Sequence, residues 1–451
     1  MSFPVDQAGW HRRVLSLALP VMLAGMTVPL VGAVDTAVVG RLENEIPLAA
    51  VAVGATIFST VFWVFGFLRM GTTGFIAQAH GRGDRQEASV AFGRALLTAL
   101  VLGFALIALQ GPVGSLALRL MGAPAEVTRQ AAEYFSLRVL SAPFTFINYC
   151  VLGALIGQQR TNAVLLLQVG LNLCNLLLDL LFVPGLGMQV RGVALASLCS
   201  EVLTALAGLY FLRHILPLQI LRSAPGRRQL FDRLAWRRLF SVNGDLFVRT
   251  FLLTGGFFFF TSQSADFGAG VLAANAILIN MLMMLSYGLD GYAHAAEALT
   301  GAAWGGGRVS VFRRAVRYTT FWSLMTAVLA CVLYAFAGEG IIALMTTLPG
   351  VRAQAAVYLP WVVFSPLVAV WCYQLDGIFL GATRTAAMRN SAFLSLLGLV
   401  LSAWWLMPLL GNHGLWAAMM VFHLLRGGLL GLAYPGLLRA LRGRVRQSAV
   451  A

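Results

Sequence analysis

Long apolar segments are the feature that most constrains how this 451-residue chain folds. Hydrophobic residues make up 59% of it and charged residues only 11%. A stretch of about 20 apolar residues is long enough to cross the hydrocarbon core of a bilayer as a helix. Because a backbone in hydrocarbon must satisfy its own hydrogen bonds, such stretches form helices rather than loops. The sequence therefore predicts an all-α membrane protein.

About twelve such stretches occur, six in each half of the chain, and they predict twelve transmembrane helices. The predicted spans are residues 14–40, 48–79, 90–111, 131–156, 162–183, 191–212, 236–261, 270–302, 312–336, 354–380, 389–410 and 414–436.

An internal repeat relates the two halves. Four residues recur after an offset of 224 positions: Gly153, Gly157, Arg160 and Thr161 reappear as Gly377, Gly381, Arg384 and Thr385. Six spans return the chain to its starting side, so we expect two parallel six-helix lobes around a central site. We place the N-terminal lobe at residues 1–218, a basic cytoplasmic linker at 219–235 and the C-terminal lobe at 236–451.

The net charge of +15 is distributed as in a membrane protein rather than a nucleic-acid-binding one. With the N-terminus in the cytoplasm, 23 arginines fall on the inner side and five on the outer side, and seven of the inner ones lie in residues 213–238. Positive residues stay inside, so both termini are expected in the cytoplasm. The expected partner is the lipid bilayer, and no nucleic acid is expected.

Missing residue types exclude several kinds of chemistry. The chain contains no lysine, so it has neither a Walker A loop nor a Schiff-base amine. It has no HExxH motif, and its five cysteines show no CxxC spacing. We therefore expect no enzyme activity, no metal and no cofactor, and an ion gradient as the source of energy.

Intramembrane carboxylates are the strongest functional signal, because burying one in a bilayer costs about 2.5 kcal/mol or more. Asp35 ends a span in which Pro20 favours a bend. A polar stripe at helical spacing is formed by Gln168, Asn172, Asn175 and Asp179. The alternative explanation for this stripe is structural, as a row of hydrogen bonds between neighbouring helices. In the next span, Ser197 and Glu201 share a face by i, i+4 spacing and are candidates for the same pocket.

Several motifs resemble the multidrug and toxic compound extrusion (MATE) transporters. The segments are VDTAVVG at 34–40, GRGDR at 81–85 and DGIFLGATRT at 376–385. DGYA followed by AAEAL within 290–299 is similar to the DinF-type branch. The resemblance runs from about residue 12 to about 440 and implies two six-helix lobes forming a V, with efflux driven by protons or sodium.

The resemblance also implies a set of functional residues. A cation or proton site in the N-terminal lobe would consist of Asp35, Asn175, Asp179 and Ser197, with Pro20 as the bend of the first helix. From the helical spacing described above, Gln168, Asn172 and Glu201 are further candidates to line the cavity or support the site, and Asp376 is a fourth. Asp376 matches a place where one branch of the family has a C-lobe carboxylate, but the seventh-helix acid of that branch has no clear equivalent here.

These observations together predict an antiporter of amphipathic, mostly cationic compounds that works by alternating access. Protons are the expected coupling ion, with sodium at the same four residues as the alternative. We expect a monomer in the bacterial inner membrane. A lipid-precursor flippase of the same superfamily and a major-facilitator-type transporter are the other functions considered.

Overall fold

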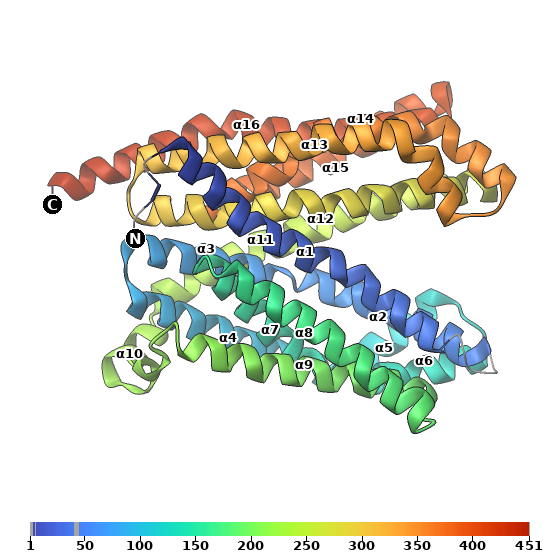
Figure 1. Ribbon diagram of the computed structural model, residues 1–451, viewed down its shortest axis with the longest axis horizontal. Helices are drawn as coiled ribbons and strands as arrows, with labels where there is room; N and C mark the ends of the chain where they lie inside the picture. Colours follow the sequence, from blue (N-terminus) through green and yellow to red (C-terminus); the bar gives the residue numbers. More distant parts are fainter. Residues whose placement is uncertain (1–2, 5, 40–44, 451) are drawn as a thin grey trace. The chain divides into compact units, whose positions relative to one another are not determined.

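The computed structural model of the protein describes residues 3–4, 6–39 and 45–450, and the side chains of residues 28–45 and 448–450 lie outside its description. Within these residues the chain is helical and contains no strand (Figure 1). The all-α prediction is therefore confirmed.

The helices of the first half of the chain are α1 (Gln7–Val39), α2 (Glu45–Val64), α3 (Phe67–Arg82), α4 (Arg85–Ala108), α5 (Gln110–Met121), α6 (Ala125–Arg138), α7 (Ala142–Gly157), α8 (Thr161–Leu180), α9 (Gln189–Arg213) and α10 (Ala224–Leu230). A 3₁₀ turn, η1 (Val139–Ser141), joins α6 to α7, and a π-helical turn, η2 (Leu181–Gly185), follows α8. A second 3₁₀ turn, η3 (Leu218–Arg222), precedes α10.

The helices of the second half are α11 (Arg233–Ala265), α12 (Ala269–Gly305), α13 (Val309–Met345), α14 (Pro349–Gly381), α15 (Thr385–Leu410) and α16 (Asn412–Val450). Apart from α1, every helix of the first half is shorter than these six, which are joined by short loops (Figure 1).

Helices occupy all twelve predicted spans as far as their residues are described. Among the described residues, ten helical segments are long and apolar enough to cross a membrane. The remaining two predicted spans correspond to α1 and α11, each of 33 residues. The protein is therefore a multi-pass membrane protein whose fold has twelve membrane spans, some of them built from two consecutive helices.

The chain divides into two compact units. The first, called here the C-terminal unit, consists of Met1–Met22, Gly81–Gly83 and Phe240–Ala451. The second, the N-terminal unit, consists of Leu23–His80 and Asp84–Leu239. One of the boundaries between them falls inside α1, two residues after Pro20. The lobes placed by sequence at 1–218 and 236–451 remain a prediction.

The start of α1 belongs to the C-terminal unit because its apolar face packs on α12 and α13. The indole of Trp10 stacks on the ring of Tyr318 with 5.8 Å between centroids, and Trp322 Nε1 donates to His11 Nδ1 at 3.0 Å. On α12, Gly291 leaves room for Met22, since a β-carbon at Gly291 would lie 2.8 Å from the carbonyl oxygen of Ala18. This contact needs a glycine.

The repeated glycines found in the sequence lie where helices pack closely in both units. In the N-terminal unit, Gly153 of α7 faces α3, and a β-carbon there would lie 2.5 Å from the Arg69 carbonyl oxygen. In the C-terminal unit, Gly381 of α14 faces α12, and its β-carbon would lie 2.5 Å from the Glu297 carbonyl oxygen. Small residues that let backbones approach are the usual device for packing helices in a bilayer. The repeat thus marks equivalent seams.

Replacing the seam glycine Gly153 by alanine is expected to destabilise the purified protein by about 1–3 kcal/mol, because a methyl group must enter a filled space. The measurement is thermal unfolding in detergent. The control is Gly170→Ala on α8, where no atom lies within 4 Å of the added carbon. An alanine there should keep or raise stability, since alanine favours helix. Equal changes in thermal stability for the two substitutions would contradict close helix packing at Gly153.

Candidate functional site

The polar stripe of α8 lies on the helix face that packs against protein. Asn175 and Asp179 are buried, and Asp179 is completely inaccessible. The leucines on the other side of the helix, Leu166, Leu173 and Leu177, are half or more exposed. This division is expected of a helix in a bilayer, where apolar side chains face lipid and polar ones face protein or water.

The stripe is connected along its length by hydrogen bonds. Gln168 Nε2 donates to Asn172 Oδ1 at 3.4 Å, and Asn172 Nδ2 donates to Thr27 Oγ1 of α1 at 2.6 Å. Thr27 Oγ1 in turn donates to the Ala24 carbonyl oxygen at 2.7 Å. The amide of Asn172 therefore ties α8 to the part of α1 that follows Pro20.

The deep end of the stripe holds the carboxylate. Asn175 Nδ2 donates to Asp179 Oδ2, and Ser200 Oγ of α9 donates to Asn175 Oδ1 at 3.3 Å and to the Ser197 carbonyl oxygen at 3.0 Å. The structure thus brings Asn175, Asp179 and the Ser197–Ser200 turn of α9 together. Ser200 was missed by the sequence analysis. Its signal is the i, i+3 spacing from Ser197, which places both residues on one face of α9.

The backbone changes its winding directly after this carboxylate. Residues Leu181–Gly185 form a π turn that contains Pro184, whose missing N–H and ring disfavour continuation of the α-helix. Short π segments occur often at functional sites because they alter which side chains face one direction. Gln189, at the start of α9, then adopts a left-handed conformation with φ of 48°.

Two of the predicted site residues lie on α1. Pro20 is a buried residue within the helix. The backbone of Asp35 also belongs to α1, but its side chain lies outside the described residues. The pairing of Asp35 with Asp179 therefore remains a prediction.

Glu201 contacts a different set of residues from those around Asp179. Asn148 Nδ2 of α7 donates to Glu201 Oε2 at 2.6 Å, and Arg138 Nη2 of α6 lies 3.8 Å from Glu201 Oε1. Ser200 faces α8, while Glu201 faces α6 and α7. The role of Glu201 as a cavity or supporting residue remains a prediction.

In the C-terminal unit, Asp376 is held between two arginines. Arg249 of α11 and Arg426 of α16 both donate to Asp376 Oδ2, the latter at 2.7 Å, and all three side chains are buried. Asp376 is therefore ion-paired on α14 with cations from two other helices. An ion pair favours the charged form of a carboxylate, which makes this group a structural junction.

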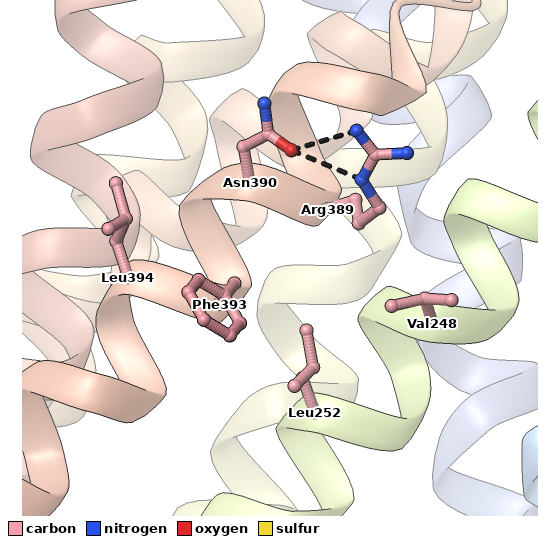
Figure 2. A pocket seen from close by; sticks show the side chains of 6 residues that line it. All are labelled: Val248, Leu252, Arg389, Asn390, Phe393 and Leu394. Carbon is pink, nitrogen blue, oxygen red and sulfur yellow. Dashed lines mark hydrogen bonds between the residues drawn. The ribbon is translucent and has the colours of Figure 1, made fainter.

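Asp245 of α11 also accepts hydrogen bonds from another helix, in this case one from a hydroxyl and one from a guanidinium of α15. Thr385 Oγ1 donates to Asp245 Oδ2 at 2.9 Å, and Arg389 Nη1 donates to Asp245 Oδ1 at 2.6 Å. Beside this pair, a pocket of about 420 Å³ lies between α11 and α15 and is lined by Val248, Leu252, Arg389, Asn390, Phe393 and Leu394. Figure 2 shows Arg389 bound to Asn390 at one end of the pocket and apolar side chains along the rest.

The oxygens around Asp179 are the set that suits a small cation. Carboxylate, amide and hydroxyl oxygens are hard ligands of the kind that alkali and alkaline-earth ions prefer. Within the described part of the chain, no group of three or more His, Cys, Asp or Glu residues has the arrangement of a metal site.

Comparisons with known proteins agree with this architecture. The family model MatE matches residues 20–181 and 246–404. The chain is 42% identical to DNA damage-inducible protein F of Escherichia coli (strain K12) over 94% of this chain and 90% of that protein. It is 22% identical to Multidrug export protein MepA of Staphylococcus haemolyticus (strain JCSC1435), over 47% of this chain and 46% of MepA. The solved structure described as "Crystal structure of MATE in the bent conformation" superposes with a TM-score of 0.88, at 22% identity and covering 96% of this chain and 97% of the other.

Neutralising the acid of the C-terminal junction is expected to destabilise the protein. Asp376→Asn leaves Arg249 and Arg426 buried without their counter-charge, and breaking a buried pair in this manner costs about 3–5 kcal/mol. Thermal unfolding of the purified variant measures the effect, with Asp266→Asn, an exposed acid after α11, as the control. A variant as stable as the wild type would show that this ion junction does not hold the three helices together.

Proposed function

Because this chain belongs to the MatE family of transporters, we propose that it is a multidrug exporter that exchanges small amphipathic cations for protons. The observation that carries the proposal is the fully buried carboxylate of Asp179, which lies in a multi-pass membrane protein among neutral amide and hydroxyl groups. Buried intramembrane acids mark ion pathways by default. The name of the relative MepA, a multidrug export protein, supports export as the direction of transport.

Proton binding at Asp179 is the step that couples the ion to the substrate. Asp179 accepts a hydrogen bond from the neutral amide of Asn175, whereas Asp376 accepts hydrogen bonds from two arginines. If Asp35 lies beside it, two like charges in a desolvated site favour sharing one proton. Protonation removes negative charge from the site, and a cationic substrate is then held less strongly.

The same proton changes the hydrogen bonds of the stripe. An ionised Asp179 only accepts hydrogen bonds, whereas a protonated one also donates one. Its neighbour Asn175 is bonded to both Asp179 and Ser200, so a change at the carboxylate is passed to α9. Through Asn172, the stripe is also bonded to Thr27, seven residues after Pro20. We propose that rearrangement of these bonds changes the bend of α1 at Pro20 and expels the substrate.

The proposal also covers the membrane in which the protein lies and its orientation there. We place the protein in the bacterial inner membrane as a monomer, with both termini in the cytoplasm, because 23 of its arginines then lie on the inner side. Membership of the MatE family sets aside the major-facilitator alternative. A lipid-precursor flippase is less favoured, since the buried Arg249 and Arg426 are engaged by Asp376.

Asp179→Asn is expected to abolish export of a cationic dye from cells while leaving expression and thermal stability near wild type. Asparagine keeps the size of the side chain and removes its titration. Dye accumulation in whole cells measures export, and Glu133→Gln, an acid of an exposed ion pair on α6, is the control. Wild-type export by Asp179→Asn would refute proton coupling at this residue.

Asn175→Ala tests whether the stripe acts as one site. Its loss of export should add little to that of Asp179→Asn, because residues that work as a unit are not additive. Fully additive losses would indicate two separate sites.

The coupling ion is tested by measuring dye transport in proteoliposomes across which a proton gradient or a sodium gradient is imposed separately. An imposed proton gradient in sodium-free buffer should drive dye transport, and an uncoupler should stop it. A sodium gradient at equal pH on both sides should drive none. If sodium alone drives transport, the residues Asp35, Asn175, Asp179 and Ser197 bind sodium, and the proposal of proton exchange is wrong.

A further inference from the structure

A second pair of charged residues lies at mid-depth in the N-terminal unit. Glu201 is twelve residues from either end of the span Gln189–Arg213. Arg138 is thirteen residues into the span Ala125–Gly157, which is 33 residues long. Both therefore lie near the middle of their spans, where an ionised side chain is most costly and most often functional. The coupling scheme built on Asp179 uses neither residue.

Aromatic rings cover the cation of this pair. The guanidinium carbon of Arg138 lies 5.7 Å from the ring centroid of Phe58 and 5.7 Å from that of Phe62, both on α2. The two buried rings are 5.1 Å apart. These distances are within the range in which an aromatic face attracts a cation. Two aromatic faces with a carboxylate close by are the usual elements of a site for an organic cation.

The ion pair within this site is loose. Arg138 Nη2 and Glu201 Oε1 are 3.8 Å apart. The nitrogen–oxygen distance in a charge-assisted hydrogen bond is shorter, about 2.7–2.9 Å. The other carboxylate oxygen, Oε2, is held by Asn148 at 2.6 Å. Asn148 Oδ1, on the same amide group, is buried and has no hydrogen-bond partner among the residues that the structure describes. The carboxylate is thus fixed in place by Asn148 rather than by the arginine.

The backbone beside Arg138 is also irregular. The α-helical winding of α6 ends at Arg138, and the 3₁₀ turn η1 (Val139–Ser141) follows before α7 begins. Arg138 Nη1 donates to Ser141 Oγ of this turn. A 3₁₀ turn in the middle of a span often marks a hinge. Arg138 therefore has a second anchor, on its own segment, apart from Glu201.

We propose that Phe58, Phe62, Asn148 and Glu201 form a binding site for a monovalent organic cation, and that the guanidinium of Arg138 fills this site as a tethered competitor. An incoming aryl or alkyl ammonium ion replaces the guanidinium between the rings and Glu201. Arg138 then keeps its contact with Ser141. The inference rests on the proposed export of cations, and it places one of their binding sites apart from the residues that bind the coupling ion.

Binding without any ion gradient tests the site, so a failure of proton coupling leaves this test unaffected. The probe is benzyltrimethylammonium, titrated into the full-length protein in detergent by calorimetry. Arg138→Gln removes the competitor and should tighten binding at least tenfold. Glu201→Gln removes the attracting charge and should weaken it at least tenfold, and the double variant should lose the gain. Arg138→Lys keeps a tethered cation and should stay within twofold of wild type.

The matched controls are Glu133→Gln and Arg191→Gln, which break an exposed ion pair of the same unit and should leave the affinity unchanged. A purely structural ion pair would lower stability in both single variants without moving the affinity in opposite directions. If either single variant does not fold, Phe62→Leu decides, because leucine keeps an apolar side chain without the aromatic face, and affinity should fall about fivefold. Unchanged affinity in Arg138→Gln, Glu201→Gln or Phe62→Leu overturns the proposal.

Discussion

The cost of an unsatisfied charge inside a bilayer governs the arrangement of the polar residues in this protein. Glu201, Asp245 and Asp376 have partners from other helices. Asp179 is bonded to Asn175 of its own helix, and Asn175 is bonded in turn to Ser200 of α9. Because water is absent from the hydrocarbon region, these partners had to come from the chain itself. Glycine seams bring two of the helices that carry these residues, α7 with Asn148 and α14 with Asp376, close to their neighbours.

Asp376 of the C-terminal unit and Asp179 of the N-terminal unit have partners of different chemistry. In the C-terminal unit, guanidinium groups of Arg249 and Arg426 neutralise Asp376, so this carboxylate has no need of a proton or metal ion. In the N-terminal unit, Asp179 accepts a hydrogen bond from the amide of Asn175, which in turn accepts one from the hydroxyl of Ser200. The internal repeat therefore preserves the packing of the halves but not their electrostatics.

Much of the fold follows from the sequence because it depends on local patterns. Apolar length predicted the positions of the spans, and the offset of Gly153 from Gly377 predicted two related halves. The face of the α8 stripe followed from helical spacing. The partners of these residues did not, because they come from distant parts of the chain. Nothing in the local pattern links Asn172 to Thr27, 145 residues away, or Asp376 to Arg249, 127 residues away.

The glycine seams also determine which helices are able to move independently. Lipid chains are as apolar as leucine, so helices in a bilayer are held together mainly by close contact rather than by exclusion of water. Where glycine brings two backbones together, many dispersion contacts and Cα–H···O contacts form at once. Separating α3 from α7, or α12 from α14, would lose all of them in one step. We therefore expect the two helices of each pair to move together as one rigid body.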